Sequence, residues 1–204
     1  MSVEEILKQW GIAAEQDEYF LEYLQKQYPN NVFFIDYCPF PAGDKYDQVE
    51  ILFQEVLERK ADRDEYMKIE RKFNDVMVKL WLYNEVYVYF NYIYTKRYNK
   101  GYRKLFRQYI KGCPASKNNP ISDKKVLEML TRLSFRLSIQ IEIYLKEFQM
   151  VVVPSFSCFV VYFHDISYKE VVEKIVNVEG LYLRKYYKDS FAYADIAYET
   201  GCIV

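Results

Sequence analysis

The stretch from Leu133 to Leu145 reads LSFRLSIQIEIYL, and it decides the expected fold. Its odd-numbered positions are all apolar, whereas its even-numbered positions are polar or amphipathic. Successive side chains of a β-strand point to opposite faces, so this alternation predicts a strand with one apolar face and one face that meets water. We take it as the central strand of an α+β fold, in which helices pack mainly on one face of a single sheet.

The rest of the chain predicts a mixed or antiparallel sheet of about five strands, with Glu85–Tyr94 as its second central strand. Pro154 and Ser155 predict a bend at a sheet edge or a break. The other expected strands are Val32–Cys38, Phe148–Val153, Phe156–His164 and a hairpin of Leu181–Tyr187 with Phe191–Tyr198. Apolar residues at helical spacing predict helices between Ser2 and Gly11 and at Glu15–Tyr28, Tyr46–Lys60, Asp64–Leu82, Lys100–Lys111, Ser122–Leu130 and Tyr168–Val178.

The length of 204 residues suits a single α+β domain over residues 1–204. Its N-terminal part, residues 1–30, is expected to be helical, and residues 112–120 form an expected mobile loop because they lack any periodicity. Ser2 with Glu5, and Ser167 with Glu170, have the spacing of capping boxes, which predicts that a helix begins at each pair.

Composition and charge restrict the class of protein. Hydrophobic residues make up 51% of the chain, which excludes a disordered chain, and the net charge of −1 gives no global sign of a nucleic-acid or membrane partner. The four cysteines are widely spaced, which indicates reduced thiols in a cytoplasmic protein. No signal peptide and no transmembrane helix is expected, because the first residues and the longest apolar runs lack the required patterns.

The sequence offers few catalytic or metal-binding candidates, and we assign no catalytic residue, metal or cofactor. His164 is the only histidine, so a His-rich metal site cannot form. It could act with Cys38 or Cys158 as a nucleophilic pair, or it could simply end a strand before the Asp165 turn, which is the preferred interpretation. Asp36 lies in an apolar strand, and we expect it to point outward rather than to be paired inside.

Two groups of residues are candidates for binding a partner. The first is basic and contains no acidic residue, and aromatic rings lie between its charges: Lys96, Arg97, Lys100, Arg103, Lys104, Arg107 and Lys111. This pattern suits either the solvated side of a helix or a nucleic-acid contact. The second group is tyrosines on the polar strand faces, which suit either packing or an exposed aromatic patch that binds a protein: Tyr87, Tyr89, Tyr144, Tyr186 and Tyr187.

Three stretches carry a resemblance to a known family. They are Asn84–Asn91 followed by Lys104–Lys111, then Asp165–Val172, and finally Thr200–Val204, the sequence TGCIV. Together they resemble an uncharacterised bacterial family that is defined only as a domain of unknown function. The chain departs from that pattern because it lacks the aspartates expected before Gly201. The resemblance implies a bacterial source and supplies no catalytic residue.

These observations predict a bacterial, cytoplasmic, non-catalytic protein that acts by binding another protein. A toxin-neutralising (immunity-type) role is one concrete form of this function. The alternative is a nucleic-acid-binding or nucleic-acid-processing protein that uses the basic segment 96–111.

Overall fold

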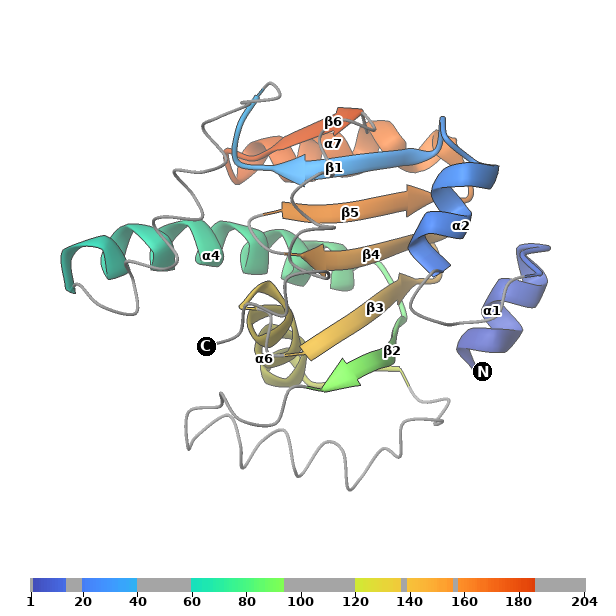
Figure 1. The fold of residues 1–204 in the computed structure, drawn as a ribbon, viewed down its shortest axis with the longest axis horizontal. Coiled ribbons are helices and arrows are strands. Elements are labelled where there is room, and N and C mark those ends of the chain that lie inside the picture. The colour runs from blue at the N-terminus through green and yellow to red at the C-terminus, as the bar shows by residue number, and fades with distance from the viewer. Residues whose placement is uncertain are drawn as a thin grey trace.

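The computed structural model describes residues 2–13, 20–39, 60–93, 120–136, 139–155 and 158–185. Within this part of the chain, six strands form one antiparallel sheet in the order β2-β3-β4-β5-β1-β6. Figure 1 shows the sheet extending from β6 and β1 at one edge to β2 at the other. The expected α+β fold with a single sheet is confirmed, with six strands where about five were expected.

The chain order of the strands differs from their order in the sheet. β3, β4 and β5 follow one another as hydrogen-bonded neighbours, whereas β1 lies between β5 and β6. Because β1 is antiparallel to both, β5 and β6 run parallel and are joined by α7. The bounds are β1 (Val32–Asp36), β2 (Val86–Ile93), β3 (Ile139–Leu145), β4 (Met150–Ser155), β5 (Cys158–Phe163) and β6 (Tyr182–Lys185).

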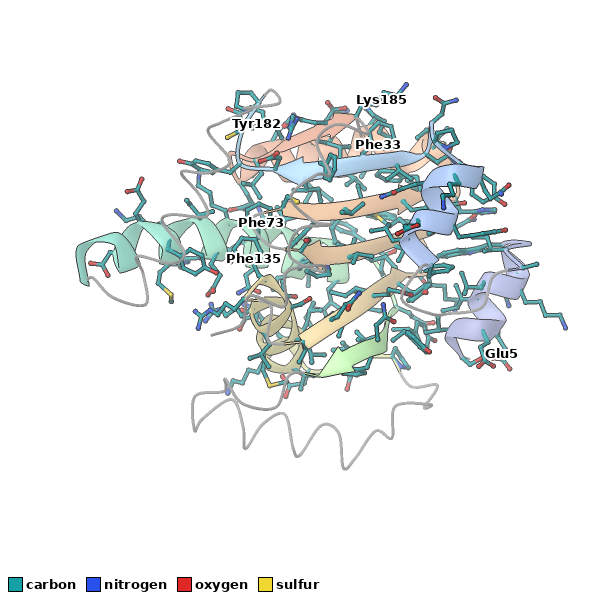
Figure 2. All side chains as sticks on the ribbon, in the orientation of Figure 1. Glu5, Phe33, Phe73, Phe135, Tyr182 and Lys185 are labelled. Carbon is teal, nitrogen blue, oxygen red and sulfur yellow. The ribbon has the colours of Figure 1, made fainter. Side chains whose placement is uncertain are left out.

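Three helices cover one face of the sheet and form the larger core: α4 (Lys60–Trp81), α6 (Lys124–Phe135) and α7 (Lys169–Val178). The odd-numbered residues of β3 all point into this core, as the alternation predicts. Phe73 of α4 lies in this core, with its ring centroid 4.8 Å from those of Phe135 and Phe159. Figure 2 labels Phe73 and Phe135. Burial of one such ring contributes about 1.5–3 kcal/mol, so this aromatic cluster joins both helices firmly to the sheet.

The opposite face of the sheet carries a second core. Two short helices, α1 (Val3–Gln9) and α2 (Phe20–Gln27), supply its outer layer, and Figure 1 shows α2 in front of the strands while α4 passes behind them. Tyr144 of β3 is fully buried here, with its ring 6.4 Å from that of Trp10. The three longer helices therefore lie on one face, as expected. The other face was expected to meet water, but α1 and α2 cover part of it.

The segment Leu133–Leu145 is not one strand, and its first part was assigned wrongly. α6 continues to Phe135, and β3 begins only at Ile139. Helical periodicity explains the difference, because the buried residues Val126, Leu127, Leu130 and Ser134 follow the 3.6-residue repeat across the start of the alternating pattern. The N-cap Asp123, whose carboxylate accepts a hydrogen bond from Lys125 N at 2.8 Å, fixes where this helix begins.

The proline and the two predicted capping boxes have separate outcomes. Pro154 does not break its strand, because it lies near the end of β4, beyond the pairs that join Met150–Val152 to β3. The capping box of Ser2 and Glu5 is confirmed. The second box does not form: Asp165 caps the 3-10 turn η2 (Ile166–Tyr168), from which α7 continues without a side-chain cap of its own.

Several predicted segments lie outside the described residues. These are the helix at Tyr46–Lys60 apart from its last residue, the basic helix at Lys100–Lys111, the loop at 112–120 apart from its last residue, and the second arm of the C-terminal hairpin, Phe191–Tyr198.

Candidate protein-binding surface

Large apolar side chains are exposed where α4 turns into β2. Leu82 and Tyr83 follow the last residue of α4 and are 68% and 63% exposed. Ile166, which begins η2, is also exposed, at 45%. We call the set formed by Leu82, Tyr83, Phe148, Ile166 and Tyr168 the turn-end surface, because its members come from three turns at one end of the sheet. Leu82, Tyr83 and Ile166 are its exposed members, whereas Tyr168 is half-buried and Phe148 is buried.

Asn84 fixes the first of these turns to the second. Its side chain, which is buried, donates a hydrogen bond from Nδ2 to the Leu80 carbonyl at 2.7 Å. Its Oδ1 accepts a hydrogen bond from the Phe148 amide at 2.8 Å. One side chain therefore satisfies a carbonyl at the end of α4 and an amide of the β3–β4 turn, and it holds the two turns at a fixed spacing.

A second set of contacts joins the same two turns at the surface. The Glu85 amide donates to Glu147 Oε2 at 2.6 Å, and the Lys146 amide donates to the Glu85 carbonyl at 3.2 Å. Lys146 Nζ also lies 2.7 Å from Glu85 Oε2. The hydrogen bond from Lys146 lowers the pKa of the Glu85 carboxyl, so this group is ionised at neutral pH.

Three aromatic rings connect the turns in a stack. The ring of Tyr83 lies on that of Phe148, with centroids 6.2 Å apart and an interplanar angle of 19°. Phe148 in turn stacks on Tyr168, with a centroid distance of 5.4 Å and an angle of 29°. The η2 turn that carries Tyr168 is held by Asp165, whose carboxylate accepts a hydrogen bond from Ser167 N at 2.9 Å. One face of the exposed Tyr83 ring therefore packs against the buried ring of Phe148.

These contacts hold the exposed side chains of the turn-end surface in place, which makes it the candidate site. Contiguous exposed apolar side chains mark interaction sites, and aromatic residues are enriched at the centres of interfaces. A surface whose residues are already ordered loses less conformational freedom when a partner binds. One feature of the sequence points to this surface: the apolar run Trp81-Leu82-Tyr83 extends past the end of the helical period into a turn.

The two tyrosines that were predicted to bind a partner do not form an exposed patch. Tyr87 is only 4% exposed, and its hydroxyl donates to Glu85 Oε2 at 3.2 Å. Burial, with the nearby Glu85 carboxylate, raises the pKa of Tyr87. Tyr89 is half-buried against the second core, and Tyr144 is fully buried in it. The prediction of an exposed patch at these strand positions is wrong, because α1 and α2 contribute a core on the face that was expected to meet water.

The other predicted binding residues lie outside the described part of the chain. They are Lys96, Arg97, Lys100, Arg103, Lys104, Arg107 and Lys111, together with Tyr186 and Tyr187. Binding by the basic segment therefore stays a prediction from the sequence.

The structure separates Cys38 and Cys158 from His164. Cys158 begins β5 and His164 follows its end, so the two residues are about 20 Å apart along the strand. Cys38 follows β1, whose last residue Asp36 pairs with Cys158, and it therefore lies at the end of the sheet away from His164. Neither thiol can pair with the imidazole, whose ring instead stacks on Trp10 at 5.7 Å. Burial also raises the pKa of Cys158.

Asp36 does not point outward as expected. It is 2% exposed, and its carboxylate forms an ion pair with Arg184 of β6, which is itself buried. It also accepts a hydrogen bond from Cys38 N at 2.9 Å. The prediction that Asp36 points outward is therefore wrong. Its carboxylate can be buried because β6, the neighbouring edge strand, supplies the guanidinium of Arg184.

Comparisons with known proteins give no relative: no family model matches the chain, and neither a curated protein nor a solved structure matches it. The resemblance to a bacterial domain of unknown function therefore stays a prediction from the sequence. Among the helices that the structure describes, none combines the length and apolar character needed to cross a membrane. Residues 2–13, 20–39, 60–93, 120–136, 139–155 and 158–185 contain no group of three or more His, Cys, Asp or Glu that could hold a metal ion.

Proposed function

We propose that this protein acts by binding another protein through the turn-end surface. The observation that supports this most directly is the exposure of Leu82 and Tyr83, at 68% and 63%, on a turn that Asn84 holds in place from both sides. A side chain of this size gains about 1.5–3 kcal/mol when it is buried, so covering two neighbouring ones supplies a strong anchor for a partner.

A toxin-neutralising protein of the bacterial cytoplasm is one concrete form of this function. Such a protein acts by covering a surface of the toxin, so it needs an exposed anchor and no reacting groups of its own. The turn-end surface meets the first requirement. The four widely spaced cysteines suit the reducing compartment that this proposal assumes.

Site-specific cross-linking in the native host tests the proposal. A photo-reactive phenylalanine analogue replaces Ser167, an exposed residue between Ile166 and Tyr168. The matched control carries the analogue at Val178, which is 73% exposed at the far end of α7. We expect a discrete protein adduct from the Ser167 position that disappears when Leu82→Asp is added, and no adduct of the same protein from Val178.

Affinity measured with the purified adduct partner then decides the role of the surface. Leu82→Asp is expected to weaken binding at least about thirtyfold, as loss of a central anchor does, while Val178→Asp leaves it unchanged. Both substitutions replace an exposed aliphatic residue, so the unfolding free energy should change by less than about 0.5 kcal/mol in either variant. A partner that binds Leu82→Asp as tightly as the wild type would rule out the turn-end surface.

Nucleic-acid binding is the second candidate, because seven basic residues occur between Lys96 and Lys111 without an acidic one. A gel shift with RNA or DNA that weakens with salt, and that is abolished by the double substitution Arg103→Glu and Arg107→Glu, would favour it. If no shift occurs even at low salt, nucleic-acid binding is excluded as a function.

A further inference from the structure

Four carboxylates lie in or close to the turns of the turn-end surface: Glu85, Glu147, Asp165 and Glu170. Glu85 pairs with Lys146, and Glu170 pairs with Lys174, so each of these carboxylates is offset by its neighbour. In the described part of the chain, no lysine or arginine forms an ion pair with Glu147 or Asp165. Glu147 is exposed and accepts a hydrogen bond from the Glu85 amide, and the Asp165 carboxylate accepts one from the Ser167 amide.

Both carboxylates are placed by the turns that carry the exposed rings. Glu147 precedes Phe148, whose ring lies against Tyr83 on one side and Tyr168 on the other. Asp165 precedes Ile166, and the amide of the adjacent His164 donates to the Gln149 carbonyl at 2.8 Å, which joins this turn to the β3–β4 turn. The hydrogen bond from Ser167 lowers the pKa of Asp165, so the group is negative at neutral pH. Two fixed negative charges therefore border the stack of rings.

An exposed tyrosine ring attracts a cation through the negative potential of its π face. The ring of Tyr83 is 63% exposed and stacks on Phe148. A partner side chain with a long aliphatic stem and a terminal positive charge suits these groups. Its stem would cover Leu82, and its charge would contact the ring of Tyr83 or the carboxylate of Glu147.

From this juxtaposition we infer that the turn-end surface binds a basic segment of a partner protein, in which arginine or lysine stands next to an apolar anchor. The inference rests on the proposed function, and it specifies the chemistry of the partner. A nucleic acid is not the expected ligand of this surface, because Glu147 and Asp165 would repel its phosphates.

Selection from a random peptide library displayed on phage, against the immobilised full-length chain, tests the inference. Clones that bind the wild type and not Leu82→Asp are sequenced, and the enriched peptides are synthesised for affinity measurements. We expect these peptides to be rich in arginine or lysine beside leucine or aromatic residues. Raising the salt from about 0.05 to 0.5 M should weaken their binding about three- to tenfold, because salt screens exposed charges.

Neutral variants of the two acids give the decisive comparison. Glu147→Gln combined with Asp165→Asn keeps an oxygen that can accept from each amide and removes both charges, and it should weaken the selected peptides about three- to tenfold. The matched control, Glu4→Gln, neutralises an exposed carboxylate on α1 and should have no effect. Selected peptides without basic residues, or peptides indifferent to the double variant, would overturn the inference and leave the proposed function standing. A library that yields no clone sensitive to Leu82→Asp would overturn both.

Discussion

The carboxylate of Glu70, which is 2% exposed, lies in the fork of the Arg136 guanidinium. Arg136 Nε donates to Oε2 at 2.5 Å and Nη2 donates to Oε1 at 2.8 Å, which is the bidentate geometry that binds a carboxylate most strongly. Arg132, one turn earlier on α6, adds a contact of 3.6 Å. This pair fastens α4 to the C-terminal end of α6 and closes the edge of the larger core next to Phe135.

Replacing Arg136 with Met should lower the unfolding free energy by about 2–3 kcal/mol, because the buried carboxylate of Glu70 then keeps, among the described residues, only its ion pair with Arg132. Urea denaturation measures the change. Arg71→Met is the control, since Arg71 pairs with Asp75 at 3.7 Å on the exposed side of the same helix and should contribute less than about 0.5 kcal/mol. The double variant Glu70→Met and Arg136→Met should be more stable than Arg136→Met alone, and equal losses for Arg136→Met and Arg71→Met would contradict the role of the pair.

The same arginine shows where sequence patterns predict this fold and where they stop. The alternation of Ile139–Leu145 predicts β3 and the face that its apolar residues bury, because a strand leaves only two directions for a side chain. In the sequence the alternation extends back to Leu133 and includes Arg136, yet Arg136 is the C-cap of α6. The boundary depends on Phe135 packing against Phe73, a residue far away in the sequence, and a local pattern contains no information about that contact.

The candidate surface was harder to predict than the fold for a related reason. Exposure of Leu82 and burial of Tyr87 are decided by which helices cover which part of the sheet, and the hydrophobicity of each residue does not determine this. The strand positions of Tyr87 and Tyr144 are correct, but the layer of α1 and α2 that covers them comes from the distant N-terminal region. Likewise, the burial of Asp36 follows from Arg184 on a neighbouring strand, which the sequence does not place beside it.

Asn84→Ala should destabilise the protein by about 1–3 kcal/mol, because it leaves the Leu80 carbonyl and the Phe148 amide without their buried partner. Exchange of the Phe148 amide with deuterium should become faster, since that amide loses its acceptor. Asn177→Ala on the exposed side of α7 is the control and should change stability by less than about 0.5 kcal/mol. Unchanged protection of Phe148 in Asn84→Ala would show that Asn84 does not hold the two turns together.

Gln149→Gly should stabilise the protein by about 0.5–1 kcal/mol. Gln149 closes the β3–β4 turn with a φ of 46°, a conformation that strains any residue with a Cβ and that glycine adopts freely. Gln149→Ala removes the same side chain and keeps the strain, so it serves as the control and should give no gain. The two urea unfolding midpoints decide the matter: a glycine variant no more stable than the alanine variant would show that the turn stores no strain at this position.

His164 should titrate below its ordinary pKa of about 6.5, because its ring is stacked on Trp10 and partly removed from water. The adjacent Asp165 carboxylate raises the pKa of His164, but this effect is smaller than that of burial. His164 is the only histidine, so its ring gives a single set of proton resonances whose pH titration reports the pKa directly. Trp10→Ala should move that pKa back towards 6.5, and a pKa at or above about 6.5 in the wild type would contradict the structure.

The same shift makes stability depend on pH in a defined direction. A base with a lowered pKa in the folded state binds fewer protons than it does in the unfolded chain, so its contribution is complete above about pH 6.5 and declines as the pH falls below that value. His164→Phe keeps an aromatic ring against Trp10 and removes the titration, and it should therefore lose less stability than the wild type between about pH 7.5 and 5.5. Asp165, whose pKa is lowered by the Ser167 amide, titrates under more acidic conditions and leaves this comparison unaffected.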